Sequence, residues 1–90
     1  MLGNQTPEEL LSEGNVEEAI KILDQLIAHK PLSDELHYIR GKAYYKKGDW
    51  QKAIQDYMEA IALNSESPAK ETLKFTVNIL NFYNKDIYNQ

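Results

Sequence analysis

A chain of 90 residues is long enough for one small domain with a modest core, and its 42% hydrophobic and 27% charged residues are typical of a folded globular protein. The formal net charge of -4 argues against a nucleic-acid-binding protein, because neutralising phosphates requires a basic surface. With no cysteine in the chain, disulfides and cysteine-ligated zinc are excluded. No apolar run approaches the roughly 20 residues that cross a bilayer, and "MLGNQTPEEL" is not a secretory signal, so we expect a cytoplasmic protein.

The first predicted helix is short and has a clear start signal. Thr6 can act as the N-cap, Pro7 suits the first helical position, and Glu9 completes a capping box. Gly14 should end this helix after about two turns, because glycine readily adopts the left-handed conformation of a helix C-terminus.

The second and fourth predicted helices share one amphipathic pattern. Between Val16 and Pro31 the apolar residues recur at steps of three and four, which predicts a helix with one buried face. The same offsets recur 34 residues later, after a predicted cap at Asp49. The two sets are Val16, Ala19, Ile20, Leu23, Leu26 and Ile27, and then Trp50, Ala53, Ile54, Tyr57, Ala60 and Ile61.

Two further helices complete the predicted fold. One is capped by Ser33 or Asp34 and extends to about Lys47, and the other begins at Ser67-Pro68 and extends to about residue 83. The last residues, "NKDIYNQ", show no periodicity, and no segment shows the strict alternation of a strand. These patterns predict an all-α protein with about five helices.

The sequence repeats itself at an interval of 34 residues. "EGNVEEAI" at 13–20 is matched by "KGDWQKAI" at 47–54, with Gly14 over Gly48 and Ala19 over Ala53. A short helix, a glycine turn and an amphipathic helix that recur at this interval predict a solenoid of stacked helix pairs.

Residues 34–67 resemble the tetratricopeptide repeat (TPR) family most closely. The resemblance rests on "AYYKKGDWQKAIQDYMEAIAL" and on five positions that match the family pattern, Gly41, Tyr44, Ala53, Tyr57 and Ala60. It implies a helix-turn-helix repeat solenoid in one domain. Its expected parts are a first repeat at about 6–33 with a truncated first helix, a second at 34–67, a capping helix at about 68–84 and a tail at 85–90.

Three departures from the family pattern bear on the packing. His37 stands in the usual tryptophan position and Arg40 in the usual leucine position, so the third helix should bury less apolar surface than in most members. Phe75 replaces the small residue at which a partner helix would approach the fifth helix closely. The fifth helix is therefore predicted to be a terminal cap and not a third full repeat.

The resemblance implies that the first helices of successive pairs line a concave, partner-binding face. Residues 34–48 carry four basic and two acidic residues inside an acidic protein, so this face is expected to be mildly basic and to favour an acidic segment of another protein. The predicted partner-binding residues are Tyr38, Lys42, Tyr45 and Lys46 on the third helix, Leu11 on the first, and Thr72 and Thr76 on the fifth.

The fifth helix is apolar on two sides, and two explanations are open. Leu73, Val77 and Leu80 would cover the fourth helix, whereas the other side holds Phe75, Ile79 and Phe82. That second side could be covered by the tail through Ile87 and Tyr88, or it could meet a second copy of the chain. The chain is accordingly expected to be a monomer or a weak homodimer.

No pattern indicates an enzyme, a cofactor or a metal site. His29 and His37 match no ligand spacing, and there is no glycine-rich phosphate loop. The expected function is protein binding without catalysis, and the alternative is a structural, self-assembling module.

Overall fold

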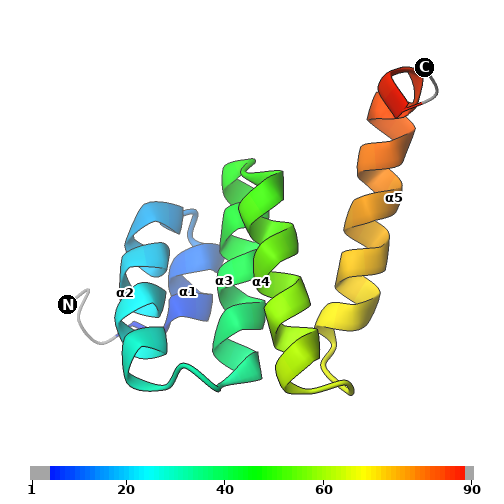
Figure 1. The fold of residues 1–90 in the computed structure, drawn as a ribbon. Helices are drawn as coiled ribbons and strands as arrows, with labels where there is room; N and C mark the ends of the chain where they lie inside the picture. The colour runs from blue at the N-terminus through cyan, green and yellow to red at the C-terminus, as the bar shows by residue number, and fades with distance from the viewer. Residues whose placement is uncertain (1–4, 89–90) are drawn as a thin grey trace.

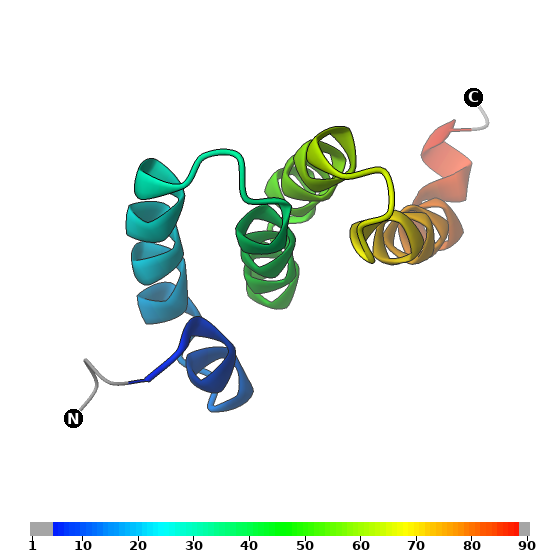
Figure 2. The same cartoon turned by 90° about the horizontal axis from the view of Figure 1, so that it is seen from below.

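The computed structural model describes the backbone of residues 5–88 and the side chains of residues 5–82. Within this range the chain forms five helices and no strand, which confirms the predicted all-α class. Helices α1, α3 and α5 lie along one side of a curved row, and α2 and α4 lie along the other (Figure 1 and Figure 2). The helices are α1 (Pro7–Ser12), α2 (Val16–His29), α3 (Asp34–Lys47), α4 (Trp50–Leu63) and α5 (Ala69–Tyr88).

The two repeated glycines form the bends inside the first two helix pairs. Gly14 and Gly48 have φ angles of 86° and 91°, a left-handed conformation that costs other residues free energy. At the second bend the Gly48 N–H donates to the Tyr45 carbonyl at 3.1 Å, and the Asp49 N–H donates to the Tyr44 carbonyl at 2.9 Å. The same pair of bonds, at 3.1 and 2.8 Å, closes the first bend. These are the hydrogen bonds of a Schellman motif, so both predicted bends are confirmed.

The predicted N-caps are also present. The Thr6 hydroxyl accepts from the Glu9 N–H at 3.1 Å and the Glu9 carboxylate accepts from the Thr6 N–H at 2.9 Å, which completes the capping box. The side chains of Ser33 and Asp49 each accept from the amide three residues further on, at 3.3 and 3.2 Å. Local hydrogen bonds therefore fix where α1, α3 and α4 begin.

The core consists of two clusters of buried side chains that meet at α3. Half-buried Tyr44 packs against both clusters, and buried Gly41 allows α3 to approach α4. A Cβ atom at Gly41 would lie only 2.6 Å from a ring carbon of Tyr57, so the close approach requires glycine. The first cluster contains Leu10, Leu11, Ala19, Ile20, Leu23, Ile39 and Ala43, and the second contains Ala53, Tyr57, Ala60 and Ala69.

Helix α5 is longer than predicted. Its length contradicts the explanation that the tail folds back over the side of α5 that holds Phe75, Ile79 and Phe82. It extends over 20 residues to Tyr88, because the segment after Pro68 contains neither glycine nor proline. The predicted tail at 85–90 is thus helical as far as Tyr88, and the last two residues lie outside the described range. Since Ile87 belongs to the same continuous helix as Phe75, the chain does not turn back to cover that side.

The side of α5 that packs on α4 also differs from the prediction. Ala69 and Thr76 are buried and Leu73 packs against the second cluster, whereas Val77 is 36% exposed. Thr76 can be buried because its hydroxyl donates to the Thr72 carbonyl at 2.8 Å, which satisfies its polar atom inside the helix.

Candidate binding groove

Three side chains, which are spaced four and three residues apart in the sequence, lie on one side of α3. Tyr38, Lys42 and Tyr45 are all half-buried. The Lys42 ammonium lies 4.8 Å from the centroid of the Tyr38 ring, and the Tyr38 hydroxyl lies 3.2 Å from the Thr72 hydroxyl on α5. Tyr45 packs edge-on against Trp50, with ring centroids 4.9 Å apart. Neighbouring side chains therefore hold this aromatic surface in place before any partner arrives.

An apolar hollow lies between α3 and α5, and we call it the lysine hollow. It has a volume of about 310 Å³. The rings of Tyr45 and Phe75 contribute apolar surface to it, with Tyr57 buried beneath them, while Lys42 and Lys46 place positive charge beside it. Burial raises the pKa of the Tyr57 hydroxyl above its ordinary value of 10.0. The described lining residues are Lys42, Tyr45, Lys46, Tyr57, Thr72, Phe75 and Thr76.

A second hollow adjoins the first at Lys42, and we call it the acid hollow. It has a volume of about 280 Å³ and lies where α1, the start of α3 and the segment before α5 meet. Three carboxylates and Lys42 line it, so the face that was predicted to be mildly basic carries its acidic side chains at the start of α3 and its lysines further along. The described lining residues are Glu8, Asp34, Glu35, Tyr38, Ile39, Lys42, Ser67 and Pro68.

Two of the predicted partner-binding residues do not offer their side chains to a ligand. Leu11 is 5% exposed because six-residue α1 contributes both of its leucines to the first core cluster. Thr76 is 1% exposed and belongs to the contact between α5 and α4. Tyr38, Lys42, Tyr45, Lys46 and Thr72 do line the two hollows.

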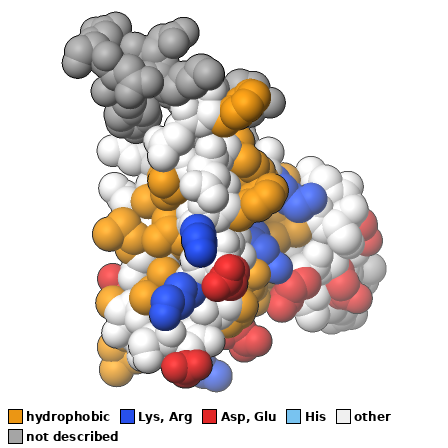
Figure 3. Space-filling view, turned by 90° about the vertical axis from the view of Figure 1, so that its right-hand side faces the viewer, with side chains coloured by type: hydrophobic (Ala, Val, Ile, Leu, Met, Phe, Trp, Pro, Cys, Tyr) orange, Lys and Arg blue, Asp and Glu red, His pale blue; other side chains and the backbone are white. Residues whose placement is uncertain are grey.

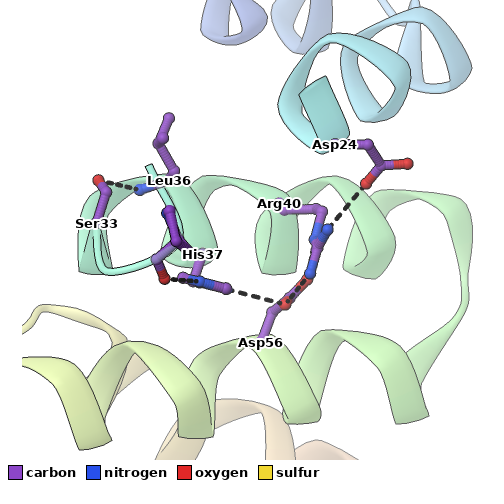
Figure 4. Close-up of polar contacts among 7 residues, drawn as sticks. Asp24, Ser33, Leu36, His37, Arg40 and Asp56 are labelled. Carbon is purple, nitrogen blue, oxygen red and sulfur yellow. Dashed lines mark hydrogen bonds and ion pairs between the residues drawn. The ribbon is translucent and has the colours of Figure 1, made fainter. Parts of the chain in front are cut away.

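A partly buried polar network connects α2, α3 and α4 through His37 and Arg40, the two polar residues of α3 at positions that are usually apolar in the family. The Arg40 guanidinium donates to both oxygens of Asp56 on α4, at 2.8 and 2.9 Å, and to Asp24 on α2 at 2.9 Å (Figure 4). His37 lies beside it, with Nε2 3.0 Å from the Pro31 carbonyl oxygen and Nδ1 3.6 Å from Asp56. Hydrogen bonding to Asp56 raises the pKa of Arg40 against the opposing effect of burial. The network is structural, and it explains how polar residues occupy positions that are usually apolar.

Asp56 was not identified from the sequence as the buried partner of Arg40, although its position in the sequence indicates this role. Asp56 lies three residues after Ala53 and four before Ala60, which places it on the packed side of α4. A carboxylate there needs a cationic partner, and Arg40 in a usually apolar position is the matching charge.

The described residues hold no group of three histidine, cysteine, aspartate or glutamate side chains that could bind a metal ion. In the described part of the chain, no helix is both long and apolar enough to cross a bilayer. His29 is exposed at the end of α2, whereas His37 is buried in the Arg40 network.

The outer side of α5 exposes large apolar side chains. Phe75 and Phe82 are 62% and 72% exposed, and Ile79 is half-buried. The view onto the α5 end of the molecule shows apolar side chains along this helix, with charged side chains between them (Figure 3).

Antiparallel helix pairs joined by glycine bends and stacked side by side (Figure 1) define the class of helical repeat proteins. Residues 8–68 match the tetratricopeptide repeat family, and the chain belongs to that family. Members of this family are typically scaffolds without enzymatic activity, and they mediate protein–protein interactions.

A solved structure has a similar fold. The chain is 47% identical in sequence to the Bacteroides fragilis protein BF1650, whose structure was determined by solution NMR. The two folds superpose with a TM-score of 0.83, and the match covers 93% of this chain and 86% of that one.

Proposed function

We propose that the groove formed by the lysine and acid hollows binds an extended or helical segment of another protein. The observation that carries the proposal is the aromatic and cationic surface of α3, with Lys42 held 4.8 Å from the Tyr38 ring centroid. Rigid tyrosines supply contact area at low entropic cost, and Lys42 and Lys46 favour an acidic residue or a carboxylate. Binding would position the partner and involve no catalysis or cofactor.

Phage display of random peptides tests the proposal with Lys42→Glu as the groove variant. Lys21→Glu makes the same charge change at an exposed residue and is the matched control. Lys21 belongs to α2, and this helix lies on the opposite side of the row from α3 (Figure 2). The wild-type and Lys21→Glu proteins should enrich peptides that bind with micromolar affinity, and Lys42→Glu should lose them while circular dichroism shows that it remains folded. Peptides bound equally by all three proteins would contradict the proposal.

The exposed side of α5 supports a second candidate function, which is self-association. Phe75 of α5 occupies the position that corresponds to Gly41 of α3, and at Gly41 the following helix packs closely. No following helix exists among the described residues, and Phe75 is 62% exposed. A second copy could pack against Phe75, Ile79 and Phe82 and form a weak homodimer.

Sedimentation equilibrium at micromolar to millimolar concentration tests self-association. A dimer that dissociates in Phe82→Asp, with the helical content unchanged, would support it. A strict monomer over this range would rule it out and leave the groove as the working surface.

A further inference from the structure

The two hollows carry opposite charges, and this constrains what the groove can hold. Glu8, Asp34 and Glu35 line the acid hollow, whereas no described acidic residue lines the lysine hollow. None of Glu8, Glu35, Lys42 or Lys46 forms an ion pair with another described residue. The charges at both ends are therefore available to a ligand.

Compensation of the helix dipole explains only some of the charged residues that line the two hollows. Acidic residues in the first turn of α3 and lysines in its last turn compensate the helix dipole. Lys42 lies in the middle of α3, where the dipole gives it no advantage. It is held at the junction of the two hollows by the Tyr38 ring, and the Glu8 carboxylate comes from a different helix.

The lysine hollow is large enough to accommodate one large apolar side chain of a ligand. Its 310 Å³ lies at the lower limit of about 300–1,000 Å³ for ligand pockets, which suits a single side chain better than a cofactor. The rings of Tyr45 and Phe75 contribute to its surface.

The length of α3 sets the distance between the two ends. Glu35 and Lys46 are 11 residues apart on one helix, which corresponds to about 16 Å at 1.5 Å per residue. An extended peptide advances about 3.3 Å per residue, so roughly five of its residues span this distance.

From this geometry we infer that the ligand is an extended peptide with opposite charges at its two ends. A large apolar residue with an acidic neighbour occupies the lysine hollow, and a basic residue about five positions away lies at the acid hollow. The inference rests on the proposed function of the groove and adds the charge pattern and spacing of its ligand. The same charge pattern is expected whether the peptide runs parallel or antiparallel to α3.

Selection from a randomised nine-residue peptide library on phage tests the inference. Wild-type protein should enrich peptides that pair an acidic and a large apolar residue with a basic residue about five positions away. Replacing the apolar residue by serine in an enriched peptide should weaken binding about tenfold or more, since a buried side chain of this size contributes about 1.5–3 kcal/mol. Replacing it by another large apolar residue is the matched control.

Charge reversal in the protein gives an independent test. Lys46→Glu should abolish the preference for an acidic residue at the apolar end, because it leaves the lysine hollow with one charge of each sign. Glu35→Lys should weaken the preference for a basic residue at the other end, where Glu8 and Asp34 remain. Each reversal should weaken binding of the wild-type-selected peptides about fivefold, as expected for partly exposed charges. Lys21→Glu should leave the preferences unchanged, and circular dichroism shows whether each variant is folded.

The possible failures are distinguishable. Enriched peptides that lose binding to Lys42→Glu but show no charge pattern would overturn the inference and leave the proposed function intact. If no peptide is enriched by wild-type protein over Lys42→Glu, both are refuted.

Discussion

The Arg40 network provides a quantitative test of how α2, α3 and α4 are held together. Arg40 contacts two carboxylates that differ in burial: the side chain of Asp56 is 8% exposed and that of Asp24 is 52% exposed. We expect Asp56→Ala to destabilise the fold strongly and Asp24→Ala to destabilise it little.

The magnitudes follow from the geometry. Removing one partner of a fully buried ion pair costs about 3–5 kcal/mol, because the remaining charge is left uncompensated. The Arg40 side chain is 22% exposed and keeps its bond to Asp24 in the Asp56→Ala variant, so we expect about 2–3 kcal/mol. Asp24→Ala removes an exposed partner and should cost about 0–1 kcal/mol.

Urea and thermal unfolding followed by circular dichroism at neutral pH would measure these differences. For a domain of this size 1 kcal/mol shifts Tm by about 4–8 °C, so Asp56→Ala should lower Tm by roughly 10–20 °C. Equal losses for Asp56→Ala and Asp24→Ala would refute the reasoning. The double variant Arg40→Met/Asp56→Leu should be more stable than Asp56→Ala, because apolar pairs of similar size can replace buried ion pairs.

Three further predictions concern the bends and the core. Gly48→Ala should cost about 1–2 kcal/mol by urea unfolding, because φ is 91° and space alone does not relieve that strain, and an unchanged stability would contradict the assignment of this bend. Ala53→Leu should cost about 1–3 kcal/mol in the same assay, because Ala53 is fully buried where α3 meets α4, and an unchanged free energy of unfolding would show that the helices pair differently. The raised pKa of Tyr57 stabilises the fold fully below pH 10, and this contribution is lost as the pH rises above 10. The wild-type protein should therefore lose stability relative to Tyr57→Phe by up to about 1.4 kcal/mol per pH unit there, and parallel pH profiles would contradict the burial of this hydroxyl.

Local features of the fold could be predicted from the sequence because their interactions span only a few residues. The capping box at Thr6 and the two glycine bends depend on hydrogen bonds between residues at most five positions apart. The end of α5 could not be placed in this way, since "NKDIYNQ" contains neither an apolar period nor a helix-stopping residue.

The candidate groove was predicted in part. The spacing of Tyr38, Lys42 and Tyr45 was enough to place them on one side of α3. The burial of Thr76 could not be predicted, because it depends on how α5 is rotated against α4. A threonine can enter that contact only when its hydroxyl bonds the backbone of its own helix.

The 34-residue period by itself determined that this chain is a stack of helix pairs, because each amphipathic helix must bury its apolar side against the next. Only the tertiary structure decided which side chains of other helices complete the two ends of the groove. Glu8 on α1 reaches the acid hollow beside the start of α3, and Phe75 on α5 reaches the lysine hollow near its end. Neither neighbour lies within a few residues of α3 along the chain, so only the packing of whole helices brings these groups together.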